Sequence, residues 1–217
     1  MSEVRARTIE STPEEVAYEL RAAEGSIWTG TRLVVGIATF AFASLAFAYF
    51  YLRSSNNEDL WRPGGITAPT AIGAAIAALM AAITALQAFG LRRLQAGQTI
   101  DWLIAGWLGV LGGLIAIGLQ IYELTRLPFF PGSSGYASCF IGWASLNIAA
   151  IFAGTYWLET VLARALRLRR NIDASEASAG GETPSARLFR VNVESSTYFW
   201  GYLGLVSVLF WVLFYVV

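Results

Sequence analysis

Residues 102–124 read WLIAGWLGVLGGLIAIGLQIYEL, an apolar stretch of 23 residues in which Glu123 is the one charged side chain. A helix needs about 20 such residues to cross the hydrocarbon core of a bilayer. Lipid offers no hydrogen bonds to backbone amides, and a helix satisfies these amides within its own chain. The stretch therefore predicts a transmembrane helix.

Four further stretches have the same character and lie at about residues 33–52, 68–91, 137–163 and 197–217. The chain of 217 residues is 56% hydrophobic and 14% charged, whereas an ordinary soluble domain is about one-quarter charged. The alternating pattern of a membrane β-barrel is absent from the sequence. We therefore expect an all-α integral membrane bundle of five transmembrane helices.

The predicted domains are an N-terminal segment, residues 1–32, and a membrane domain, residues 33–217, that includes a cytoplasmic loop at about 164–196. In the N-terminal segment, Thr12-Pro13-Glu14-Glu15 predicts a helix start with a hydroxyl cap, a proline in the first turn and acids at the positive helix end. Gly25 is the expected end of this short helix. The serine-, glycine- and acid-rich residues 171–185 predict a flexible part of the loop.

The basic residues are distributed unevenly between the two ends of the predicted bundle. All fifteen are arginine, and only Arg53, Arg62 and Arg126 lie on the side opposite the other twelve. The positive-inside rule then places the N-terminus in the cytoplasm and the C-terminus outside. The net charge is zero, so electrostatics give no reason to expect a nucleic-acid partner.

Ligands for a redox metal are scarce in this chain. It has no histidine, two methionines and a single cysteine, Cys139. Haem and copper sites draw on imidazole, thiolate or thioether ligands, so we expect that this chain itself binds neither. No catalytic residue is expected either, because no histidine is present to activate Cys139 or a serine.

Glu123 is the main candidate for a functional side chain, because an ionisable group inside a membrane span is costly and indicates a function by default. Gln120 lies one helical turn before Glu123 on the same face. Tyr122 directly precedes Glu123 in the sequence. Two interpretations stay open. The carboxyl is either buried in the bundle beside Gln120 or Tyr122, or it lies at the interface, facing water or paired with Arg126.

Several motifs follow one another in the order known from one membrane-protein family. GLQIYE at 118–123 resembles the Gln-x-x-Glu helix of haem-copper oxidase subunit III. AYFYLRSS at 48–55 resembles that family's Tyr-x-x-x-Arg helix end, and Trp61 and Pro63 fall where it has a Trp-Pro loop. The spacing of these motifs, the span count and the predicted orientation resemble those of the short, five-helix bacterial form of the family.

The resemblance continues through the second half of the chain and covers most of residues 33–217. Tyr136-Ala137-Ser138 resembles the family's Tyr-Gly-Ser, and ESSTYFW at 194–200 resembles its Glu-Ala-Ala-Ala-x-Tyr-Trp, which makes Glu194 a secondary candidate. The family's His-x-x-His in the fourth span is replaced by Asn147 and Ala150. The chain therefore resembles a divergent member, and roles that need the lost histidines do not transfer.

The resemblance implies a non-catalytic subunit III of a proton-pumping terminal oxidase in the bacterial inner membrane. Such a subunit packs on subunit I, together with subunit II and others, and binds structural phospholipid. It supports proton uptake and the stability of the complex. Haem and copper would lie in subunit I, and no cofactor would be bound by this chain.

Two alternative functions remain open from the sequence. The first is a subunit-III-like protein associated with a nitric oxide reductase, which the missing histidines make credible. The second is a small proton-coupled transporter with Glu123 and Glu159 as proton relays. Transporters often show inverted repeats and broken helices, and neither an internal repeat nor a mid-span proline occurs here. Glu159, close to Arg164, is also interpreted as an ordinary interfacial carboxylate.

Overall fold

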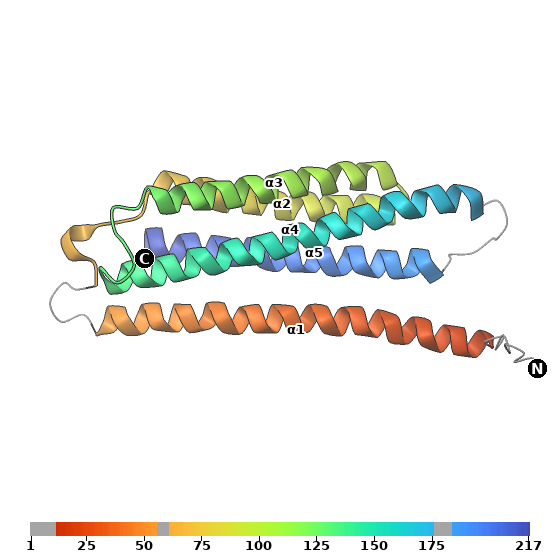
Figure 1. Ribbon diagram of the computed structural model, residues 1–217, viewed down its shortest axis with the longest axis horizontal. Coiled ribbons are helices and arrows are strands. Elements are labelled where there is room, and N and C mark those ends of the chain that lie inside the picture. Colours follow the sequence, from red (N-terminus) through yellow and green to blue (C-terminus); the bar gives the residue numbers. More distant parts are fainter. Residues whose placement is uncertain (1–11, 56–60, 176–183) are drawn as a thin grey trace, which may run out of the picture.

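The computed structural model describes residues 12–55, 61–175 and 184–217, and these residues form helices, turns and short connections without a strand. The long helices lie lengthwise side by side (Figure 1) and are α1 Pro13–Ser54, α2 Thr70–Gln95, α3 Thr99–Thr125, α4 Gly135–Ser175 and α5 Pro184–Trp211. Each is long and apolar enough to cross a membrane. The prediction of an all-helical bundle with five helices long and apolar enough to span a membrane is therefore confirmed.

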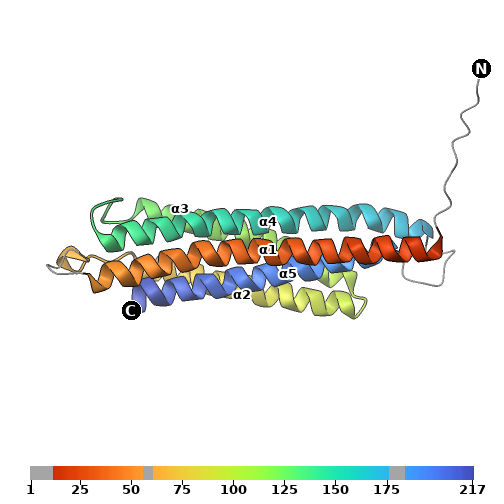
Figure 2. The same cartoon turned by 90° about the horizontal axis from the view of Figure 1, so that it is seen from below.

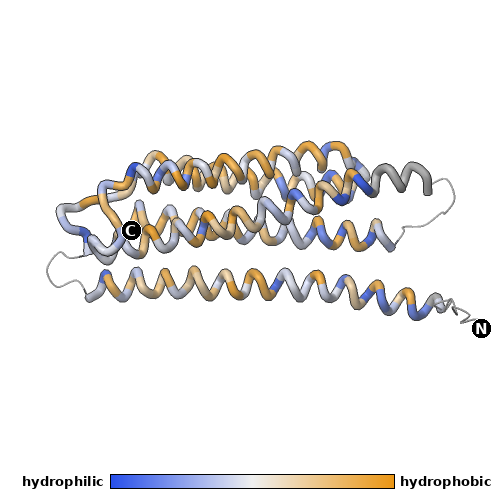
Figure 3. Tube along the Cα trace, in the orientation of Figure 1, coloured by the Kyte–Doolittle hydropathy of each residue, from blue (hydrophilic) through white to orange (hydrophobic). Residues whose placement is uncertain are grey.

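The helices form a layered bundle. α2 and α3 make a hairpin on one side, α4 and α5 lie in the middle, and α1 covers the opposite side (Figure 1; Figure 2 views the bundle from the α1 side). α5 is central because it packs against α1, α2 and α4. The most hydrophilic stretches gather toward the end that holds the N-terminus (Figure 3), and the C-terminus lies at the other end.

The start of α1 follows the sequence prediction, but its length does not. The Thr12 hydroxyl accepts a hydrogen bond from the Glu15 amide (3.3 Å), and the Glu15 carboxylate accepts one from the Thr12 amide (2.8 Å). Gly25 does not end this helix, which continues through the first span to Ser54. Contacts with α5 lie on both sides of Gly25, since Glu24 pairs with Arg187 and the Trp28 ring meets the Tyr198 ring edge-on at 6.1 Å, and these tertiary contacts override the local end signal.

The loop predicted at about 164–196 is also shorter than expected. α4 continues to Ser175 and α5 begins at Pro184, so most of this region is helical. Of the stretch 171–185 that was predicted to be flexible, residues 171–175 and 184–185 are helical, and residues 176–183 lie outside the described part of the chain. Packing accounts for the early start of α5, because its Phe189 meets the ring of Trp102 edge-on at 5.4 Å.

Two apolar clusters fill the bundle, one toward each end. The cluster nearer the N-terminal end contains Trp102, Leu162 and Trp200. The cluster nearer the C-terminal end is dominated by aromatic side chains, and we call it the aromatic cluster: Tyr49, Trp61, Tyr136, Phe140, Trp143, Phe210 and Phe214. Its rings meet mostly edge-on, the geometry that aromatic pairs favour. This cluster borders the site described next.

Candidate functional site

Glu123 lies in the last turn of α3 with its side chain directed into the bundle, and its exposed fraction is 0%. The amide of Gln120, also fully buried, donates a hydrogen bond of 2.5 Å to the Glu123 carboxylate. Arg126 does not pair with it, and its guanidinium lies over the Tyr122 ring, 5.0 Å from the centroid. The sequence left two positions open for the Glu123 carboxyl, and in the structure it is buried in the bundle beside Gln120.

The hydrogen bonds continue from Gln120 across the bundle. Asn147 of α4 donates through Nδ2 to the Gln120 Oε1 atom (3.1 Å), and Ser207 of α5 donates to Asn147 Oδ1 (3.4 Å). On the other side, the Tyr215 hydroxyl donates to Glu123 Oε1. We call these five residues the carboxyl network. It joins α3, α4, α5 and the last turn of the chain, η2 Val212–Val216.

The direction of these hydrogen bonds limits what the site can do. Each amide of the network both donates and accepts, so the bonds run from Ser207 toward Glu123, where both carboxylate oxygens are acceptors. No cation pairs with Glu123 in the described residues. A buried carboxyl with two hydrogen-bond donors and no cation beside it is suited to holding and exchanging a proton.

The other predicted residues lie outside this network. Tyr122 is 47% exposed and points away from the bundle, although it is adjacent to Glu123 in sequence. Glu159 is exposed on the surface of α4 and Glu194 is half-buried on α5. Sequence reasoning missed Asn147, Ser207 and Tyr215. Asn147 and Ser207 were detectable as polar residues within apolar spans, whereas Tyr215 reads like any interfacial aromatic residue.

Metal-ligating side chains do not gather in the parts of the chain that the structure describes. No group of three or more His, Cys, Asp or Glu side chains is placed there to hold an ion. Cys139 is buried in the aromatic cluster as a free thiol. The carboxyl network is the main polar feature at the end of the bundle that holds the C-terminus.

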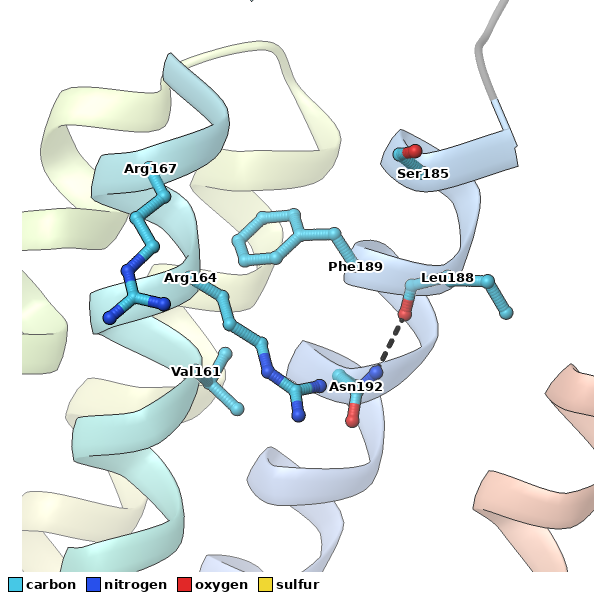
Figure 4. Close-up of a pocket in the computed structure, with 7 residues that line it drawn as sticks. All are labelled: Val161, Arg164, Arg167, Ser185, Leu188, Phe189 and Asn192. Carbon is cyan, nitrogen blue, oxygen red and sulfur yellow. Dashed lines mark hydrogen bonds between the residues drawn. The ribbon is translucent and has the colours of Figure 1, made fainter. Parts of the chain in front are cut away.

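A second polar feature is a pocket between α4 and α5 at the arginine-rich end of the bundle (Figure 4). Its volume is about 340 Å³, and its lining residues are Val161, Arg164, Arg167, Ser185, Leu188, Phe189 and Asn192. Asn192 is held by a hydrogen bond of 2.9 Å to the Leu188 carbonyl. Arg164 and Arg167 pair with no carboxylate in the described residues. The pocket thus combines positive charge with an apolar wall.

Comparison with known proteins adds no family to this picture. No protein-family model matches the chain, and no curated protein matches it. A functional proposal therefore rests on the motifs of the sequence and on the geometry of the two sites.

Proposed function

We propose that this chain is a non-catalytic, subunit-III-type component of a haem-copper terminal oxidase in the bacterial inner membrane. The observation that carries the proposal is the burial of the Gln-x-x-Glu pair at the centre of a hydrogen-bonded network. An interfacial pair would have made the resemblance at this motif incidental. Burial of a carboxyl in a membrane span is costly and calls for a functional reason.

The other motifs support the same proposal by where they lie. Tyr49, Trp61 and Tyr136 come from three different motifs, yet their rings meet in the aromatic cluster, with centroid distances of 4.9 Å and 6.0 Å on either side of Trp61. Residues far apart in the sequence that resemble one family are thus in contact with one another. Their contact supports the resemblance, because the three motifs form one packed unit at this end of the bundle.

In this proposal the chain moves no electrons. Haem and copper would lie in subunit I, and this subunit would pack on subunit I and its partners through the apolar outer surfaces of its helices. The role of Glu123 would be to hold a proton inside the bundle and to support proton uptake and the stability of the complex. The carboxyl network supplies the hydrogen bonds that such a group needs.

The pocket between α4 and α5 supports the lipid-binding part of the proposal. The guanidinium groups of Arg164 and Arg167 suit a phosphate in geometry and charge. Val161, Leu188 and Phe189 line the same pocket and suit the apolar part of a phospholipid. Because Arg164 directly follows the apolar stretch that ends at residue 163, the pocket would lie at the depth of the lipid headgroups.

The orientation follows from the arginines. The ends of α2, α4 and α5 that carry most of them lie at the same end of the bundle as the N-terminus, and we place this end in the cytoplasm. Reporter fusions at the two termini are expected to give opposite results, with the N-terminal reporter inside. Two reporters on the same side would contradict five spans.

The decisive experiment is extraction of the tagged full-length chain from its native membranes in mild detergent. The expected result is a complex with a haem- and copper-containing subunit I that reduces oxygen, while the isolated chain is colourless. A complex that reduces nitric oxide would assign the chain to the reductase-associated alternative. A monodisperse chain without any haem-containing partner would overturn the proposal. A transporter is not favoured, because no helix is broken in the middle of its apolar stretch, and the change from α5 to the π turn η2 lies at the end of the fifth stretch.

A further inference from the structure

Tyr215 is the one member of the carboxyl network that is not fully enclosed. Gln120, Glu123, Asn147 and Ser207 are each at most 2% exposed, whereas Tyr215 is half-buried. Its hydroxyl donates to Oε1 of the Glu123 carboxylate, whereas the Gln120 amide donates to Oε2. Tyr215 therefore lies between the buried carboxyl and the surroundings at the C-terminal end of the bundle.

The turn that carries Tyr215 is unusual. α5 ends at Trp211, and Val212–Val216 continue as a π-helical turn in which the Val217 amide bonds to the Val212 carbonyl (3.1 Å). A π turn is wider than an α turn and changes the direction of the side chains on it, and such turns occur often at functional sites. Here the change directs the Tyr215 ring toward Glu123.

The neighbouring helix leaves space for this ring. A Cβ atom placed on Gly73 of α2 would overlap the tip of the Tyr215 ring, lying 2.7 Å from Cε2 and closer still to Cζ and the hydroxyl oxygen. Any side chain at position 73 would therefore displace the ring. The glycine thus provides a slot through which the Tyr215 hydroxyl reaches the carboxyl.

The turn is also held in place just before Tyr215. The Phe214 carbonyl accepts a hydrogen bond of 3.1 Å from the Tyr136 hydroxyl, and the Phe214 ring is fully buried among Tyr49, Tyr136 and Phe140. Three separate features therefore position the Tyr215 hydroxyl beside the Glu123 carboxyl. They are the π turn, the space at Gly73 and the hydrogen bond from Tyr136 to the Phe214 carbonyl.

We propose that Tyr215 is the positioning residue of the Glu123 carboxyl and that η2, seated against Gly73, closes this carboxyl off from water at the C-terminal end of the bundle. The inference deepens the proposed function, on which its physiological meaning rests, because it names the element that controls access to the buried proton site. Access from this end would require the Tyr215 ring to leave its slot.

The test measures how fast Glu123 reacts with a water-soluble carbodiimide in the detergent-solubilised full-length chain, where the reagent reaches both ends of the bundle, with modified peptides quantified by mass spectrometry. Exposed Glu159 in the same molecule is the internal reference for reagent activity. In the wild-type chain Glu123 is expected to react far more slowly than Glu159. Tyr215→Ala removes both the ring from its slot and the hydrogen bond to Glu123, and it is expected to raise the Glu123 rate about tenfold or more.

Matched variants separate closure from general loosening. Tyr215→Phe keeps the ring and loses the hydrogen bond, so its rate is expected to fall between those of the wild type and Tyr215→Ala. Tyr122→Ala removes an exposed ring next to Glu123 and is expected to leave the rate unchanged within about twofold.

Gly73→Ala is the second, independent variant. It is expected to displace the ring and raise the Glu123 rate as Tyr215→Ala does, but to add nothing in the Tyr215→Ala background. Gly118→Ala on α3, where no atom lies within 4 Å of the added methyl group, is the control and is expected to behave like the wild type. Fast labelling in the wild type would overturn the inference, as would wild-type rates in both Tyr215→Ala and Gly73→Ala. The proposed function would still stand if subunit I copurifies, so the two failures are distinguishable.

Discussion

The carboxyl network and two polar side chains nearer the arginine-rich end find their hydrogen bonds in different ways. In the carboxyl network, at the C-terminal end, the bonds run from side chain to side chain. Toward the arginine-rich end, Gln87 donates to the Ala105 carbonyl (3.1 Å) and Thr84 donates to the Trp200 carbonyl (3.0 Å). These two side chains tie α2 to α3 and α2 to α5 through backbone acceptors.

The difference teaches which residues depend on one another. A backbone carbonyl remains in place when a side chain is substituted, and in a helix it keeps its own amide partner. When a side chain of the carboxyl network is substituted, its partner side chain is left without a hydrogen bond in an apolar interior. The free energy lost in this way exceeds what the hydrogen bond itself contributes. The network is therefore expected to be cooperative, and the bonds at the other end independent. The following predictions test this contrast, from the largest expected effect to the smallest.

Gln120→Leu is expected to have the largest effect on stability. It removes the partner of both Glu123 and Asn147, so two buried polar groups lose a bond, and the free energy of unfolding is expected to fall by about 2–3 kcal/mol. The matched variant Gln87→Leu removes one bond to a backbone carbonyl and is expected to cost about 1 kcal/mol. Denaturant titration in detergent micelles measures both. Equal losses would show that the network is not cooperative.

A double-mutant cycle sharpens the same contrast. Asn147→Ala and Ser207→Ala remove groups that bond to each other, so their effects on unfolding are expected to deviate from additivity by about 0.5–1 kcal/mol. Thr84→Ala and Thr155→Ala remove hydroxyls that bond to separate backbone carbonyls, and their effects are expected to add within about 0.5 kcal/mol. Additivity in the first pair would argue against a connected network.

The pocket at the arginine-rich end gives a prediction that leaves the carboxyl network untouched. Arg164→Gln combined with Arg167→Gln is expected to lower the amount of phospholipid retained through detergent purification, because the charge and donors for a phosphate are lost. Arg187→Gln is the control, since this arginine pairs with Glu24 outside the pocket. Retained lipid is quantified by mass spectrometry. Equal retention in both variants would remove the support for a phosphate site here.

The five spans, the start of α1 and the pairing of Gln120 with Glu123 were predictable because hydropathy, capping and helical spacing are local properties of the sequence. Tyr122 shows where adjacency misleads. Consecutive residues on a helix differ in direction by about 100°, so the neighbour of a buried carboxyl points outward. Gly25 shows a different limit of prediction from sequence. The local signal predicts the end of the first helix there, but α1 packs against α5 and continues to Ser54.

The remaining partners of Glu123 depend on how the helices are aligned with one another. The carboxyl network gains Asn147 from α4, Ser207 from α5 and Tyr215 from η2. The residue spacing along one helix does not determine how far a neighbouring helix is shifted along the bundle axis. Asn147 stands where the subunit III family, which the chain resembles, has a histidine, and roles that need this histidine were not carried over. The structure shows that the asparagine amide donates and accepts in the interior, so this position keeps a hydrogen-bonding side chain.

The smallest effect is expected for Glu123→Gln, and it tests what the carboxyl is for. The glutamine side chain has almost the same shape, and its amide oxygen can still accept from the Gln120 amide or the Tyr215 hydroxyl. Because one carboxylate oxygen is replaced by a donor group, one of these two contacts has to reorient, and the free energy of unfolding is expected to change by no more than about 1 kcal/mol.

Copurification with subunit I and the metal content of the complex are expected to be unchanged in Glu123→Gln, because neither depends on an exchangeable proton at this position. What the variant loses is that proton, so the expected change lies in turnover under conditions where proton uptake limits the rate, and in the number of turnovers before the complex inactivates. Glu159→Gln, on the exposed surface of α4, is the control and is expected to match the wild type in both. If Glu123→Gln also matches the wild type in both measurements, the carboxyl network holds the helices together and has no role in proton uptake.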